Sequence, residues 1–161
     1  MKKLIMAVVF GLILVGCGKE QAGIGIKYSE LVDGISIPMK EVQNEIDGKA
    51  MSGFVRNQDG GLITLYTALN GDAVTKARLV IMPSQQGNLP SDAKNLQTML
   101  RALHNIAPGW SERQDWFANA AQRAHATPNV IVTGAYGGNR FSLIEVPELR
   151  SFELEIVKGK S

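Results

Sequence analysis

The stretch LITLYTALNGDAVTKARLVIM, residues 62–82, decides the fold of this chain. Its two halves, 62–69 and 74–82, are rich in β-branched and aromatic residues, which favour β-strands. Between them stands Asn70-Gly71-Asp72. Asn-Gly is a strong signal for a type I′ hairpin turn, because both central residues of that turn need positive φ. The stretch therefore predicts two antiparallel strands joined by a tight turn.

A third strand is expected immediately before this hairpin. Residues 50–57, AMSGFVRN, have a similar composition and end at a turn signal, Asn57-Gln58-Asp59-Gly60-Gly61. Within residues 74–82, Lys76 and Arg78 alternate with apolar residues. This alternation predicts an antiparallel meander with one wet face and one covered face.

The residues after this meander change to a helical period. After Pro90-Ser91, apolar residues recur every three or four positions until Pro108-Gly109. A second helix is expected to begin at Ser111, which forms a capping box with Gln114, and to end at Thr127-Pro128. The sequence thus predicts two consecutive helices.

The last third of the chain returns to strand patterns. The runs are NVIVTGAY (129–136), RFSLIEV (140–146) and SFELEIV (151–157), with Gly137-Gly138-Asn139 as a turn between the first two. Strands, two helices and further strands predict an α+β fold. We expect a two-layer sandwich, in which a mainly antiparallel β-sheet carries a helical pair on one face.

Residues 28–48 are ambiguous. They allow one helical turn at 30–33, a short strand at 35–38, and a helical stripe formed by Met39, Val42 and Ile46.

The N-terminal segment has a distinct pattern. Lys2 and Lys3 precede an apolar run, residues 4–15, which is too short to span a bilayer but fits a secretory signal. A small residue and the only cysteine of the sequence follow, so that the junction reads Leu14-Val15-Gly16-Cys17. This junction resembles the lipobox in the signal peptide of bacterial lipoproteins.

The resemblance implies that the chain is cut after Gly16 and that Cys17 carries a diacylglycerol and an acylated amino group. Two or three acyl chains hold a protein on a membrane almost indefinitely. We therefore expect a signal peptide at 1–16, a lipidated cysteine with a flexible tether at 17–27, and a single α+β domain at 28–161. The alternatives are a cytosolic protein with a buried thiol and a secreted protein that is cut elsewhere.

The resemblance also bears on location. Gram-negative lipoproteins without Asp just after the lipidated cysteine usually go to the outer membrane, and Gly18-Lys19 follows Cys17 here. We therefore expect a lipid-anchored protein of the cell envelope, on the outer membrane and facing the periplasm.

The charge balance argues against nucleic acid. The sequence has 17 basic and 15 acidic residues, and two of the basic residues, Lys2 and Lys3, leave with the signal peptide. A nucleic-acid surface needs a local excess of Lys and Arg, which the remaining chain lacks. With a single cysteine, the domain also forms no internal disulfide and depends on its hydrophobic core.

The sequence gives little support for any catalytic residue. His104 and His125 lack the i, i+4 spacing of a helical metal site, and no G-x-S-x-G elbow accompanies them. Glu153 and Glu155 share one strand face, where we expect solvated surface. The glycine pairs lack phosphate-binding spacing and are expected to form turns. No catalytic residue, metal or cofactor is therefore predicted.

Trp110, Tyr136 and Arg140 are the candidates for a contact surface. Trp110 follows Pro-Gly, and Tyr136 and Arg140 flank the last glycine turn. Loop residues often mediate binding, although core packing is the commoner role for a tryptophan such as Trp110.

Three functions fit these observations. The first is a non-catalytic binding or assembly module that contacts an envelope protein, for instance along an open strand edge. The second is a membrane-anchored inhibitor or exclusion factor against an incoming enzyme, toxin or phage component. The third is an envelope hydrolase.

Overall fold

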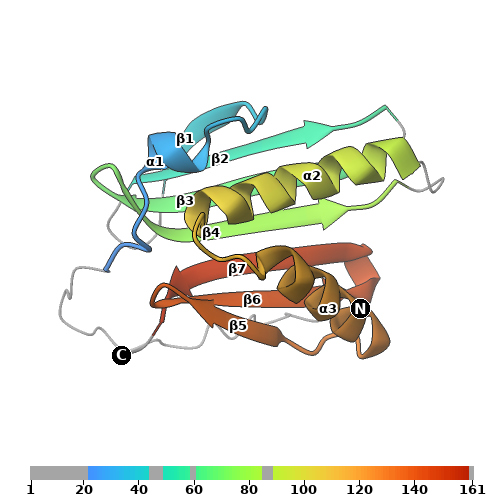
Figure 1. Ribbon diagram of the computed structural model, residues 1–161. Helices are drawn as coiled ribbons and strands as arrows, with labels where there is room; N and C mark the ends of the chain where they lie inside the picture. Colours follow the sequence, from blue (N-terminus) through green and yellow to red (C-terminus); the bar gives the residue numbers. More distant parts are fainter. Residues whose placement is uncertain (1–21, 44–48, 59–60, 85–88, 160–161) are drawn as a thin grey trace, which may run out of the picture.

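The computed structural model describes residues 22–43, 49–58, 61–84 and 89–159. Cys17 and the expected signal peptide lie outside these ranges. The described residues form an antiparallel seven-stranded sheet in the order β1-β2-β3-β4-β7-β6-β5 (Figure 1). Its strands are β1 (Met39–Gln43), β2 (Lys49–Arg56), β3 (Leu62–Asn70), β4 (Ala73–Met82), β5 (Val132–Tyr136), β6 (Asn139–Val146) and β7 (Ser151–Lys158).

Three α-helices and a short 3₁₀ helix complete the described elements. They are α1 (Tyr28–Leu31), α2 (Leu89–Ile106), α3 (Arg113–Ala126) and η1 (Pro147–Leu149). The two long helices connect β4 to β5 and lie on one face of the sheet, α2 over β4 and α3 over β5 and β6 (Figure 1). The predicted α+β sandwich with a helical pair on one face is confirmed.

The sheet consists of two meanders joined side by side. Strands β1 to β4 form the first and β5 to β7 the second, and β7 returns to pair with β4. At this junction Leu79 lies opposite Leu154, and both are fully buried under the helices. The core therefore continues across the junction as one cluster, with Met99 and Leu103 of α2 and Phe117 of α3 packed on it.

The face of the sheet opposite the helices is called the open face. Lys76 and Arg78 project onto it, whereas the alternate residues Ala77, Leu79 and Ile81 are buried on the helix side. The predicted division into a wet and a covered face is thus confirmed for β4.

Two hairpin turns differ from the expected turn chemistry. In the β3–β4 hairpin, Asn70 pairs with Ala73, so the central residues are Gly71 and Asp72, and of these Gly71 has positive φ (60°). These φ signs match a type II′ turn rather than the expected type I′. The β5–β6 hairpin has the type I′ signs instead, because Gly137 (59°) and Gly138 (75°) both have positive φ.

The ambiguous N-terminal residues form different elements from those expected. The helical turn is α1, two residues earlier than expected, and 35–38 do not form a strand. The helical stripe is wrong at Met39 and Val42, which belong to β1; Ile46 lies outside the described residues. Alternation puts these two apolar side chains on opposite faces, and Met39 packs on the core while Val42 is 37% exposed.

The start of α3 also corrects the sequence analysis. The N-cap is Glu112, without a side-chain capping hydrogen bond, so the capping box expected from Ser111 and Gln114 is wrong. The Arg113 guanidinium instead donates a 2.7 Å hydrogen bond to the Trp110 carbonyl and ties the turn between α2 and α3. None of the helices in the described ranges has the length and apolar character needed to cross a membrane.

Candidate functional site

Trp110 lies in an aromatic cluster beneath the β5–β6 hairpin. Its ring stacks on Tyr136, with centroids 5.4 Å apart and planes 3° apart, and lies 5.0 Å from the Phe141 ring. Trp110 is 7% exposed and Phe141 is fully buried, whereas Tyr136 is 36% exposed. Trp110 therefore packs in the core, and its stacking partner Tyr136 is much more exposed to solvent.

A glycine on β5 makes room for this cluster. A Cβ atom at Gly134 would lie 2.3 Å from the Trp116 Nε1 atom, well inside any tolerated contact. The Trp116 ring, whose centroid is 5.3 Å from that of Trp110, thus packs directly over the backbone of β5. The glycine at this position thus lets the Trp116 ring of α3 pack closely on β5.

Tyr136 and Arg140 do not form a common surface. Tyr136 pairs with Asn139, and Ala135 pairs with Arg140. Because neighbouring residues of a strand point to opposite faces, Tyr136 points to the helix side, and Arg140 points to the open face. The structure therefore brings Trp110 and Tyr136 together on the helix side and places Arg140 on the opposite face, so the three predicted contact residues do not form one surface.

The free edge of β5 was not identified from the sequence. In a two-residue hairpin the residues that flank the turn exchange hydrogen bonds, and the next pair does not. Since Tyr136 and Asn139 flank the turn, the backbone N–H and C=O groups of Thr133 and Ala135 point outward from the sheet. Among the described residues, no strand pairs with this outer edge.

The side chains of β5 do not protect this edge. The strand reads VTGAY, without a charge or a proline, and the preceding Val130 and Ile131 are 47% and 59% exposed. Natural proteins usually protect edge strands with charges, prolines or bulges. By this criterion, β5 is an accessible template for a further strand.

The opposite edge strand, β1, is protected in this way. It carries Lys40 and Glu41 in five residues, and Glu41 Oε2 lies 2.8 Å from the Lys49 ammonium on β2. This hydrogen bond and the Glu41 charge raise the pKa of Lys49 above its ordinary value, so the Lys49 ammonium stays charged. The two edges of the sheet are therefore chemically different.

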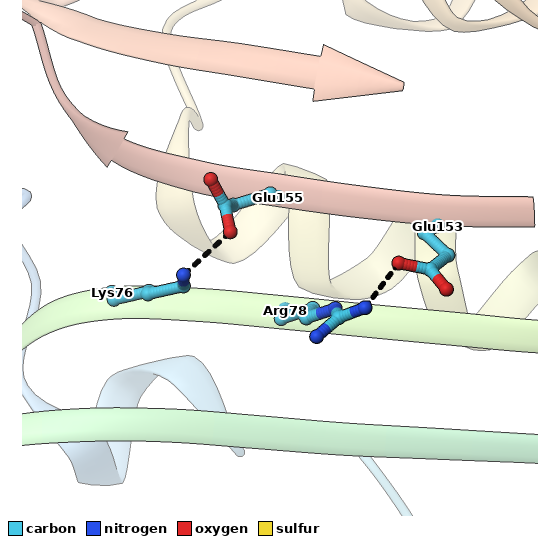
Figure 2. Close-up of polar contacts among 4 residues, drawn as sticks. All are labelled: Lys76, Arg78, Glu153 and Glu155. Atoms are coloured by element: carbon cyan, nitrogen blue, oxygen red, sulfur yellow. Dashed lines mark hydrogen bonds and ion pairs between the residues drawn. The ribbon is translucent and has the colours of Figure 1, made fainter. Parts of the chain in front are cut away.

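The open face carries two ion pairs across the junction of the meanders. The Lys76 ammonium contacts Glu155, and the Arg78 guanidinium contacts Glu153 (Figure 2). The contacts run diagonally, because the direct neighbour of Arg78 is Glu155. Glu153 and Glu155 are thus ion-paired rather than simply solvated. Their alternation with apolar residues was visible in the sequence, but their partners depend on the β4–β7 pairing.

The two histidines lie in separate surroundings. His125, near the end of α3, has its Nδ1 atom 3.0 Å from Glu145 Oε2 on β6. His104, in α2, has a buried Nδ1 atom without a hydrogen-bond partner in the described part of the chain. The described residues also hold no group of three or more His, Cys, Asp or Glu side chains placed to bind a metal.

The segment before α1 packs on the sheet. Ile24 and Ile26 are 2% and 8% exposed. Ile24 donates its N–H to the Val74 carbonyl (2.8 Å), and Val74 donates to the Ile26 carbonyl (3.0 Å). The expected tether, residues 17–27, therefore overlaps the folded region at its C-terminal end, because 24–27 belong to the packed structure.

Comparison with known proteins does not assign a family: no family model, curated protein or solved structure matches the chain.

Proposed function

We propose that this protein is a lipid-anchored protein of the cell envelope that binds another envelope protein and adds an extended segment of it to the edge of β5. The lipobox-like sequence at Leu14-Val15-Gly16-Cys17 supports anchoring through Cys17, and Gly18-Lys19 after it favours the outer membrane, facing the periplasm. In this proposal the protein acts as a non-catalytic binding or assembly module.

One observation carries the binding proposal. The edge of β5 offers outward backbone groups at Thr133 and Ala135 and has neither charge nor proline. In strand addition, main-chain hydrogen bonds supply affinity, and side chains on alternate positions supply specificity. The exposed side chains of Val130 and Ile131 extend the same edge with apolar surface, which favours a partner segment with apolar residues.

The test is site-specific photocrosslinking in intact cells. A photoreactive residue at Ile131, next to the edge, is expected to form an adduct with an envelope protein. Ala135→Pro removes one outward N–H and places a ring in the path of a partner strand, while the hydrogen bonds to β6 stay intact. The adduct yield should then fall at least about tenfold, as expected for the loss of one or two hydrogen bonds and for the added obstruction.

Ala135→Ser is the matched control, because it changes the same side chain and keeps the backbone N–H; the adduct should remain. A photoreactive residue at Phe54, which is 61% exposed on β2, reports on contacts elsewhere on the sheet. An adduct from Ile131 that survives Ala135→Pro would contradict strand addition. An adduct that forms only with an added phage component, toxin or enzyme would favour the inhibitor alternative.

A further inference from the structure

An open hollow of about 990 Å³ lies where the β5–β6 turn meets the end of β7. The start of the described chain, the turn and the end of β7 come together at this end of the sheet (Figure 1, left). Ala22, Gly138, Arg140 and Lys158 are among its lining residues. None of the described lining residues is acidic, so the hollow has a net positive lining.

The hollow lies next to the point where the chain leads toward Cys17. The Asn139 side-chain amide donates a 2.7 Å hydrogen bond to the Ile24 carbonyl, which fixes this part of the chain beside the turn. Ala22, two residues earlier, lines the hollow itself. Five residue steps separate Ala22 from Cys17, so the lipidated residue lies within about 18 Å of the hollow even when the chain is fully extended.

The two cations of the hollow are available for a ligand. The Lys158 ammonium lies close above the turn, 3.2 Å from the place of a Cβ at Gly138, and Gly159 donates a 2.9 Å hydrogen bond to the Gly138 carbonyl. Lys158 and Arg140 are both exposed. Within the described ranges, neither side chain has a hydrogen-bond or ion-pair partner.

We infer that the two cations bordering this hollow, Arg140 and Lys158, bind the phosphates of anionic phospholipid headgroups and thereby set the orientation of the domain on its membrane. The inference rests on the proposed anchoring at Cys17, which brings the hollow to the membrane surface. By strand alternation Arg140 points to the open face, whereas Lys158, which pairs with Asn139, points to the helix side. The two cations therefore contact separate headgroups on the two sides of this end of the sheet. A guanidinium binds a phosphate through two parallel hydrogen bonds, and an ammonium adds a compact charge. The β5–β6 turn then faces the lipid, and η1, at the other end of β6, faces away from it.

This orientation has a consequence for the proposed binding edge. The strand β5 runs from Val132 down to the turn at Gly137-Gly138. With the turn at the membrane, the exposed Val130 and Ile131 point away from the lipid. The headgroup contact would therefore present the edge of β5 to a partner at a fixed height above the membrane.

The experiment uses the mature lipidated protein in vesicles. Because the lipid occupies the thiol of Cys17, an introduced cysteine can be labelled alone with a fluorophore. Ala135→Cys places the label at the hollow, and Glu148→Cys places it on η1. Quenching by headgroup-labelled lipid is then compared in phosphatidylcholine vesicles with and without phosphatidylglycerol. We expect phosphatidylglycerol to increase quenching at position 135 and to leave position 148 unchanged.

The double variant Arg140→Gln/Lys158→Gln should lose this increase. A basic residue near an anionic surface favours the bound state about fivefold, so removing two should lower the ratio of docked to undocked protein roughly 30-fold. Arg56→Gln/Arg123→Gln is the matched control, because it removes two exposed cations elsewhere and should keep the increase. Equal quenching at position 135 with and without phosphatidylglycerol would overturn the inference.

One further outcome distinguishes lipid phosphate from soluble phosphate, and two others distinguish this inference from the proposed anchoring. Inorganic phosphate that shifts the Gly138 amide resonance, without any effect of phosphatidylglycerol, would assign the hollow to a soluble phosphate and overturn the lipid assignment. Protein that does not float with the vesicles would overturn both the anchoring and this inference. Protein that floats but is unquenched at position 135 would overturn this inference alone.

Discussion

The Asn139 side chain joins the start of the described chain to β6. Its amide donates a 2.7 Å hydrogen bond to the carbonyl of Ile24, 115 positions away. Ile24 in turn bonds to Val74 on β4, so the segment before α1 is fastened to both meanders. Within the expected tether, residues 17–27, the part around Ile24 is therefore fixed to the domain.

Asn139→Ala should destabilise this attachment. It leaves the Ile24 carbonyl without its donor in a buried place, which costs about 1–3 kcal/mol of unfolding free energy. Urea denaturation measures this loss, and limited trypsin digestion should cut sooner after Lys27. Asn57→Ala, which removes a longer 3.3 Å hydrogen bond to Asn95, is the control and should leave cleavage at Lys27 unchanged. Unaltered stability and cleavage in Asn139→Ala would show that the contact does not hold the segment.

Gly134→Ala should disturb the packing of Trp116. The added Cβ would lie 2.3 Å from the indole nitrogen, and relieving such overpacking typically costs about 1–3 kcal/mol. The loss should appear as a lower urea midpoint together with a change in tryptophan emission. In a Trp116→Ala background the same substitution should cost much less, and an equal cost in both backgrounds would place the strain elsewhere.

Exchanging the charges of Lys76 and Glu155 at the β4–β7 junction should reveal a small coupling energy between these two side chains. Lys76→Glu alone puts two carboxylates together with Glu155, whereas Lys76→Glu/Glu155→Lys restores an opposite-charge pair. Both side chains are about one third exposed, so the coupling energy should be at most about 1 kcal/mol. A double-mutant cycle by urea denaturation measures it, and added salt should reduce it. A coupling well above this value would mean that the pair is shielded from solvent.

Tyr28 should make the domain sensitive to alkaline pH. Burial raises the pKa of its phenol above the ordinary value of 10.0, so the folded state favours the protonated form. This contribution to stability is complete below the unfolded pKa and is lost as pH rises through the folded pKa. Urea midpoints of Tyr28→Phe, compared with those of the unchanged protein, should therefore decline less above about pH 10. If the urea midpoints of the two proteins fell equally with rising pH, Tyr28 would not make this contribution.

The sequence predicted the elements better than their arrangement. Local patterns sufficed for β3 and β4, because the apolar period and the glycine of the turn lie within residues 62–82. The pairing of β4 with β7 could not be predicted, because Leu79 and Leu154 are far apart in the sequence, with both long helices between them. The strand β1 was missed because the spacing of Met39 and Val42 fits a helix, while pairing with β2 imposes a strand.

The candidate site depended still more on tertiary structure. The separation of Tyr136 and Arg140 follows from a two-residue turn at Gly137-Gly138 and could have been worked out from the sequence. The free edge of β5 could not, because it requires the order of the strands. The burial of Trp110 likewise depends on Tyr136 and Phe141, which are brought to it by the second meander.

Hydrogen exchange at the edge of β5 tests the central claim most directly. The mature protein is compared alone and in complex with the partner that crosslinks from Ile131, and the amides of Thr133 and Ala135 are followed individually. Strand addition predicts that both outward amides exchange at least about tenfold more slowly in the complex, while Lys40 and Val42 on the opposite edge strand are unchanged. Unchanged exchange at Thr133 and Ala135 in a saturated complex would contradict the account.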